Sequence, residues 1–208
     1  MKITKDYEGL KRAENGDYIL EGDLITDEDI EIDLDDRLVV RGEIESNKSI
    51  LANTSIIAGE CIRAGGSVRA GGSVRAGDSI HADDSIHAGC GISAGDGISA
   101  GDDIHAGWGI SAGWGISAGC GIIAGDGIHA GDGIFAGDGI HAGDGIFAGE
   151  FIDCGKRIFA GASVYRDSDD CEKTIQCKEL RRGEICYGEL VITAEGGDGD
   201  GETETAEP

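Results

Sequence analysis

The chain has 208 residues and a formal net charge of -24, because 41 aspartates and glutamates outnumber 17 lysines and arginines. A chain this acidic is not expected to bind nucleic acid or an anionic membrane directly, and any partner should be basic. No apolar run approaches the roughly 20 residues of a membrane-spanning helix, and residues 1–17 are charged throughout, so a cytoplasmic location is expected.

Residues 1–37 alternate apolar and acidic side chains, for example in Asp29–Leu34. This alternation predicts short strands. We expect them to form an N-terminal cap, because an open terminal coil would offer unpaired strand edges to other chains.

Residues 38–165 carry an aliphatic residue at every sixth position, from Leu38 and Ile44 to Ile158 and Val164. A fixed short period predicts repeats that stack and share one core. Within each repeat the aliphatic residue and the alanine two places later have the same parity, so both should point inward from a short strand. The glycine-rich corner that follows is expected to use positive φ angles. The predicted fold is an all-β, single-stranded β-solenoid.

In this period the chain resembles the hexapeptide-repeat β-helix proteins, whose best-known members are acyltransferases. The resemblance covers residues 38–165 and implies a triangular, left-handed coil of about eighteen residues. The chain differs in placing its alanine after the aliphatic residue rather than before it. Acyltransferases of this family use a histidine at a subunit seam and usually an inserted loop, and the array has no interruption for one. We therefore predict no enzymatic activity, no catalytic residue and no cofactor.

The C-terminal part should cap the other end over residues 166–194. Residues 185–187 and 190–193 are typical of short strands, and residues 172–180 are expected to form a helical turn or a loop. The tail at 195–208 lacks a core-forming apolar pattern and is expected to be disordered.

Cysteine and histidine positions give no strong metal signal. The seven cysteines lack the paired spacing of zinc sites, so we expect free thiols in a reducing compartment, with Cys154 filling an inward alanine position. His87 and His105 lie eighteen residues apart and should stack, but no third ligand column accompanies them, and no metal site is predicted.

The corners of the later repeats carry an acid at every unit. Three corner acids per coil, with coils about 4.8 Å apart, would give roughly one charge per 1.6 Å, against about 1.7 Å for duplex DNA. The alternative is that aspartate is a favoured corner residue and that acidity serves solubility or growth in high salt. The two tryptophans fall on neighbouring corners, where exposed tryptophans are typical of interfaces, and phenylalanines point outward nearby. The candidate partner-binding residues are Asp126, Asp132, Asp138, Asp144, Glu150, Trp108, Trp114, Phe135 and Phe147.

Two functions remain open. The first is an acidic decoy that mimics nucleic acid and blocks a basic nucleic-acid-binding protein or complex. This logic is similar to that of the pentapeptide-repeat inhibitors of gyrase and of phage inhibitors of host defence, the anti-CRISPR and anti-restriction proteins. Such a decoy would be a monomer or small homo-oligomer, in the host cytoplasm if phage-encoded. The second is a structural or self-assembling β-helix module of the polymer-forming or phage-fibre type.

Overall fold

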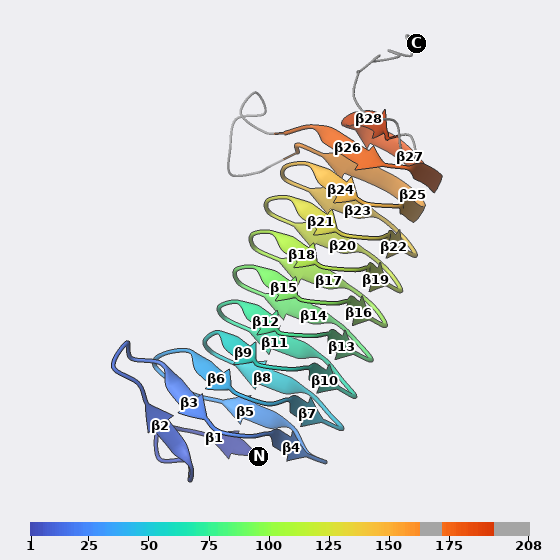
Figure 1. Cartoon of the computed structure of the whole chain (residues 1–208). Coiled ribbons are helices and arrows are strands. Elements are labelled where there is room, and N and C mark those ends of the chain that lie inside the picture. Colours follow the sequence, from blue (N-terminus) through green and yellow to red (C-terminus); the bar gives the residue numbers. More distant parts are fainter. Residues whose placement is uncertain (163–171, 194–208) are drawn as a thin grey trace.

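The computed structural model describes residues 1–162 and 172–193, and the regular elements within these ranges are all strands. The chain winds into a β-solenoid of about nine turns. Its coils stack in a single column from the N-terminal to the C-terminal end (Figure 1). The predicted all-β solenoid is confirmed. Among the described residues no helix is long and apolar enough to span a membrane.

Each regular coil contributes one strand to each of three faces. Face 1 contains β4 (Leu24–Thr26), β7 (Ile44–Ser46), β10 (Ile62–Ala64), β13 (Ile80–Ala82), β16 (Ile98–Ala100), β19 (Ile116–Ala118) and β22 (Ile134–Ala136). Face 2 contains β1 (Lys2–Ile3), β5 (Ile30–Ile32), β8 (Ile50–Ala52), β11 (Val68–Ala70), β14 (Ile86–Ala88), β17 (Ile104–Ala106), β20 (Ile122–Ala124) and β23 (Ile140–Ala142). Face 3 contains β2 (Leu10–Arg12), β3 (Tyr18–Leu20), β6 (Leu38–Val40), β9 (Ile56–Ala58), β12 (Val74–Ala76), β15 (Ile92–Ala94), β18 (Ile110–Ala112), β21 (Ile128–Ala130), β24 (Ile146–Ala148), β26 (Thr174–Cys177) and β28 (Glu189–Ile192).

The strand register fixes the length of the coil. Ile62 pairs in parallel with Ile80, eighteen residues further on, and Ile98 pairs with Ile116. Three six-residue units therefore close one coil, as the resemblance implied. The left-handed winding stays a prediction.

The core is one aliphatic column per face, flanked by alanines. Ile98 is 1 % exposed and Ala100 is 5 % exposed, whereas the intervening Ser99 faces outward. The predicted inward and outward parities are confirmed along the array. Cys154 takes an alanine position in this core and is fully buried, as expected.

The φ angles of the corner glycines differ from the expectation. Positive φ was expected at the corners, but none of the described glycines of the regular array has it. A Cβ on Gly95 would lie 1.9 Å from the carbonyl oxygen of Gly77 in the neighbouring coil, whereas a Cβ on Gly97 would lie 3.5 Å from that of Gly115. Close stacking of backbones, rather than a positive φ, is therefore what favours glycine as the first residue of these corners. The described glycines with positive φ lie towards the two ends, at Gly9, Gly16, Gly22, Gly161, Gly183 and Gly188.

At the N-terminal end the first coil is longer than the eighteen-residue coils of the regular array. Leu24 pairs with Ile44, twenty residues further on, and β2 turns back to pair antiparallel with β3. Parallel pairing already occurs inside the segment expected to form the cap, where β1 pairs with β5 and β3 pairs with β6.

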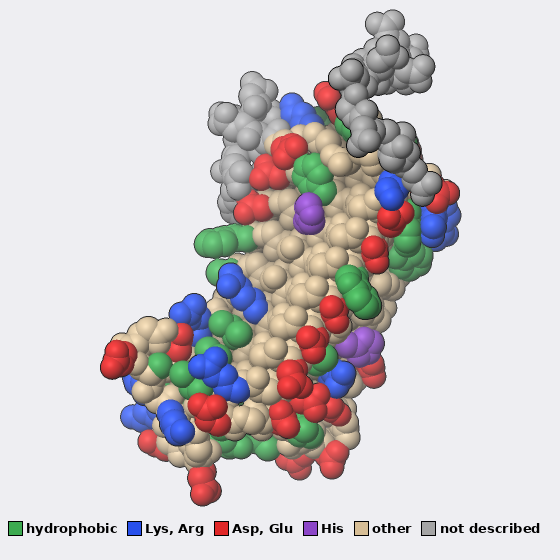
Figure 2. Space-filling view, in the orientation of Figure 1, with side chains coloured by type: hydrophobic (Ala, Val, Ile, Leu, Met, Phe, Trp, Pro, Cys, Tyr) green, Lys and Arg blue, Asp and Glu red, His purple; other side chains and the backbone are tan. Residues whose placement is uncertain are grey.

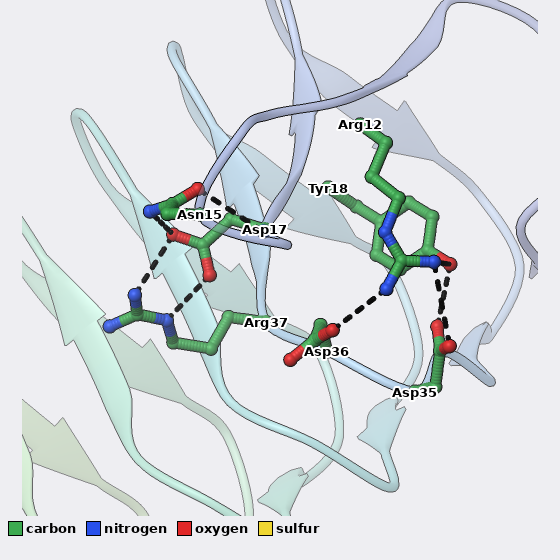
Figure 3. A network of polar contacts seen from close by, with 7 residues as sticks. All are labelled: Arg12, Asn15, Asp17, Tyr18, Asp35, Asp36 and Arg37. Carbon is green, nitrogen blue, oxygen red and sulfur yellow. Dashed lines mark hydrogen bonds and ion pairs between the residues drawn. The ribbon is translucent and has the colours of Figure 1, made fainter.

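A polar network holds this first coil together (Figure 3). Arg37 donates two hydrogen bonds to the carboxylate of Asp17, at 2.7 and 2.9 Å. These bonds lower the pKa of Asp17. The hydroxyl of Tyr18 donates to Asp35 at 2.5 Å, and Arg12 donates to the same hydroxyl at 3.0 Å. The network ties the β2–β3 turn to the longer corner between β5 and β6.

The C-terminal end departs from the six-residue period. β25 (Phe151–Ala160) runs across a corner and continues both face 1 and face 2, and β27 (Glu179–Tyr187) pairs along it. On face 3, Ile175 pairs with Ile146 at the rung for which the period predicts Val164, a residue outside the described ranges.

The predicted C-terminal elements are found in part. Strands expected at 185–187 and 190–193 lie within or overlap β27 and β28. The helical turn or loop expected over 172–180 is wrong, because Ile175 and Cys177 of β26 both fill core positions with no exposed surface. Cys171 and the tail at 195–208 lie outside the part of the chain that the structure describes.

Candidate partner-binding surface

The corners of successive coils stack directly on one another. The backbone amide of Asp132 donates to the carbonyl of Trp114 at 2.9 Å, and the amide of Glu150 donates to that of Asp132 at 2.9 Å. We name the corners by the faces they join: the first joins faces 1 and 2, the second joins faces 2 and 3, and the third joins faces 3 and 1. Each corner thus forms a ladder whose rungs lie about 4.8 Å apart.

The third corner carries an acid on five of six successive rungs. We call this set the acidic ridge; it consists of Glu60, Asp78, Asp96, Asp132 and Glu150. Trp114 occupies the remaining rung, and its side chain is 63 % exposed. Figure 2 shows a line of acidic side chains, interrupted by a hydrophobic one, running obliquely up the coils.

The structure distributes the predicted binding residues around the whole coil. Trp114, Asp132 and Glu150 lie together on the third corner. The remaining predicted residues are Trp108, Asp126 and Asp144 on the second corner, Asp138 on the first corner, Phe135 on face 1 and Phe147 on face 3. These nine residues therefore do not share one surface, and the two phenylalanines do not form a single apolar patch.

Two of the predicted acids already have lysine partners. Lys156 lies 2.7 Å from Asp138, and this hydrogen bond raises the pKa of the lysine. Lys178 lies 2.8 Å from Glu150. These contacts reduce the charge that the C-terminal coils present to a partner.

The rest of the acidic ridge is available for outside contacts. Within the described residues, Glu60, Asp78, Asp96 and Asp132 form no ion pair. Glu60, Asp78 and Asp132 are exposed and Asp96 is half-buried. A partner's lysines or arginines could therefore pair with these carboxylates without breaking an ion pair within the described chain.

The first corner carries a second group of acids near Cys120. Asp84, Asp102 and Asp138 stack with this cysteine in one ladder. Partial burial raises the pKa of the Cys120 thiol, and the negative charges of Asp103 and Asp102 raise it further. Its thiol therefore stays protonated at neutral pH.

The histidine column on face 2 has the geometry that the eighteen-residue spacing predicted. The rings of His87 and His105 stack with centroids 4.8 Å apart. Partial burial lowers the pKa of His87, and the neighbouring His105 and Arg69 lower it further. No group of three or more potential metal ligands occurs in the described residues. The six described cysteines are free thiols.

Sequence reasoning missed the N-terminal half of the acidic ridge. Glu60, Asp78 and Asp96 are spaced by eighteen residues, as are Asp132 and Glu150. Sorting the corner residues by this spacing, rather than following the acids along the chain, would have placed them in one column.

Fold and corners together define an acidic, all-β solenoid with repeats about six residues apart. Comparison of the chain with protein-family models, with curated proteins and with solved structures finds no match.

Proposed function

We propose that this protein is a non-enzymatic acidic binding protein that mimics nucleic acid and occupies the basic groove of a nucleic-acid-binding protein. The observation that supports this proposal is the acidic ridge, whose rungs are joined by backbone hydrogen bonds. Four of its five acids form no ion pair within the described residues.

The ridge is a linear array of charges, as a nucleic-acid strand is, but with a wider spacing. Its six rungs extend over about 24 Å at 4.8 Å per coil, so its five acids lie on average about 6 Å apart, against about 3.4 Å along a single DNA strand. Because the carboxylates project from stacked backbone, little conformational freedom is lost on binding, and a rigid array binds better than a flexible acidic tail.

The function class that fits this proposal is an inhibitor that competes with nucleic acid. The hexapeptide-repeat type of coil supplies a rigid rod, and the negative surface supplies electrostatic attraction to a basic groove. A phage inhibitor of host defence, of the anti-CRISPR or anti-restriction type, is the most specific form of the proposal.

The test is a capture experiment with two matched variants that remove the same number of charges. The ridge variant combines Glu60→Gln, Asp78→Asn, Asp96→Asn and Asp132→Asn. The control variant combines Asp6→Asn, Glu8→Gln, Glu14→Gln and Glu21→Gln, exposed acids near the N-terminus. Each tagged protein is incubated with a bacterial extract at low salt, and duplex DNA is then added as competitor.

We expect the wild type and the control variant to capture a nucleic-acid-binding protein and to release it when DNA is added. The ridge variant should capture at least tenfold less. Equal capture by all three proteins, or capture that DNA does not reverse, would contradict nucleic-acid mimicry by the ridge.

A second candidate function is self-association through the C-terminal end. β28 pairs only with β26 among the described strands, and its side chains Val191 and Ile192 are 44 % and 52 % exposed. An exposed terminal strand can pair with another chain. Analytical ultracentrifugation would support this candidate if the protein forms oligomers that a Val191→Lys variant does not form.

A further inference from the structure

Face 1 carries a shallow groove with an aromatic wall. The groove encloses about 700 Å³, and outward serines such as Ser99 and Ser117 lie along it. Trp114, Phe135 and Phe151 line it toward the C-terminal end. Because the serines are small and the aromatic residues are large, an apolar side chain of a partner could enter beside the rings.

Acidic corners flank this groove on both sides. The acidic ridge forms the rim toward face 3, and Asp84, Asp102 and Asp138 form the rim toward face 2. The other grooves are less negative. The groove on face 1 is lined by Asp132 and Asp153 against one arginine, Arg181. The groove on face 2 is lined by two cations and one acid, and the groove on face 3 by one arginine and no acid. Charge complementarity therefore favours a basic partner on face 1.

The strand pairing limits how a partner can bind there. β16 pairs with β13 on one side and with β19 on the other, so the middle of face 1 has no free backbone edge. A partner cannot add a strand at this place and must dock through side chains.

An α-helix matches the dimensions of the surface. The groove extends over five rungs, or about 19 Å, which equals the length of roughly thirteen helical residues. The face contains six residues from corner to corner, which limits its width to about 20 Å, and the diameter of a helix, about 10–12 Å, lies within that limit.

We propose that face 1 binds a basic amphipathic helix of the partner, with its apolar side chains in the groove and its lysines or arginines on the two acidic rims. This inference rests on the proposed function and names the element of the partner that the surface recognises. Trp114 then contacts the helix, whereas Trp108, on the second corner, does not.

The experiment uses a synthetic fourteen-residue helical peptide with one leucine stripe and lysines on both flanks, and a scrambled peptide of the same composition. Trp114 reports binding in a Trp108→Phe variant, because the chain has only two tryptophans. We expect the helical peptide to shift the Trp114 emission and to bind at least tenfold more tightly than the scrambled peptide. In a Trp114→Phe variant the emission of Trp108 should not change.

A matched pair of variants separates the groove from the charges. Ser99→Phe with Ser117→Phe fills the groove on face 1, and Ser93→Phe with Ser111→Phe adds the same side chains on face 3. Both should fold, because phenylalanine already occupies outward positions on these faces at Phe135 and Phe147.

The face 1 pair should weaken binding of the helical peptide at least tenfold, and the face 3 pair less than twofold. Equal binding of the helical and scrambled peptides, or equal effects of the two pairs, would overturn the helix inference. Nucleic-acid mimicry would survive that result, because the capture experiment depends on the ridge acids alone.

Discussion

The glycine that follows each inward alanine is constrained by the neighbouring coil. At Gly95 an added Cβ would lie 1.9 Å from the carbonyl oxygen of Gly77, which forces a backbone shift. Asp83 occupies the corresponding position in another coil, so the stack can accommodate a side chain there by a local shift. The cost of a substitution should therefore be moderate rather than prohibitive.

We predict that Gly95→Ala lowers the free energy of unfolding by about 1–3 kcal/mol through this overpacking. Gly97→Ala is the matched control at the same corner, because its Cβ would have an ordinary contact of 3.5 Å with Gly115. Its effect should stay within about 1 kcal/mol, since alanine reduces the entropy of the unfolded chain. Urea unfolding of both variants measures the difference, and equal destabilisation would show that close stacking is not what requires the first glycine.

At the scale of the strand, the residue type varies from coil to coil at the outward positions, whereas the inward positions keep an aliphatic residue and a small one. On face 2 the strands β14 and β17 place His87 directly beside His105. The folded state lowers the pKa of His87 below its ordinary value of 6.5, first by partial burial and then by the positive neighbours. The unfolded chain therefore binds this proton more readily than the folded chain, and stability falls as the pH falls through 6.5.

We predict that His87→Ser reduces this pH dependence. Serine already occupies outward positions in neighbouring columns, for example at Ser99, so the fold should tolerate the change. Thermal unfolding at pH 8 and pH 5 should show a smaller loss of Tm in the variant than in the wild type. An identical loss in both proteins would contradict the lowered pKa assigned to His87.

The sequence was sufficient to predict the strands of the repeat array, because period and parity are local properties of the chain. Ile98 and Ala100 could be placed in the core from their spacing alone. The role of Gly95 could not be predicted from the spacing, because it depends on a carbonyl oxygen in the neighbouring coil. The strand at Thr174–Cys177 was also missed, because the six-residue period is lost before it and only the pairing with β24 reveals it.

The candidate surface was predictable only in part for the same reason. Exposure of Trp114 followed from its corner position. The lysine partners of Asp138 and Glu150 could not be predicted from corner position. Lys156 and Lys178 reach these corners from the irregular C-terminal coils. Reading the acids along the chain also hid their separation onto three corners.

At the scale of the whole molecule, the coil converts a repeated sequence into a rigid charged rod. The net charge of -24 attracts any basic surface. The acidic ridge and the groove on face 1 define the part of this protein to which a basic partner should bind. Specific binding by geometry and unspecific binding by net charge therefore predict different results when equal numbers of charges are removed at different places.

The central claim is that binding depends on the acidic ridge and not on net charge alone. The most direct test measures the affinity of the captured nucleic-acid-binding protein for the wild type, the ridge variant and the control variant, over a series of salt concentrations. We predict that the wild type and the control variant bind within about threefold of each other. The ridge variant should bind at least tenfold more weakly at low salt and show a shallower dependence on salt, because fewer charges are paired across the interface. Equal affinities and equal salt dependence for the two variants would show that only net charge matters, and would contradict the account.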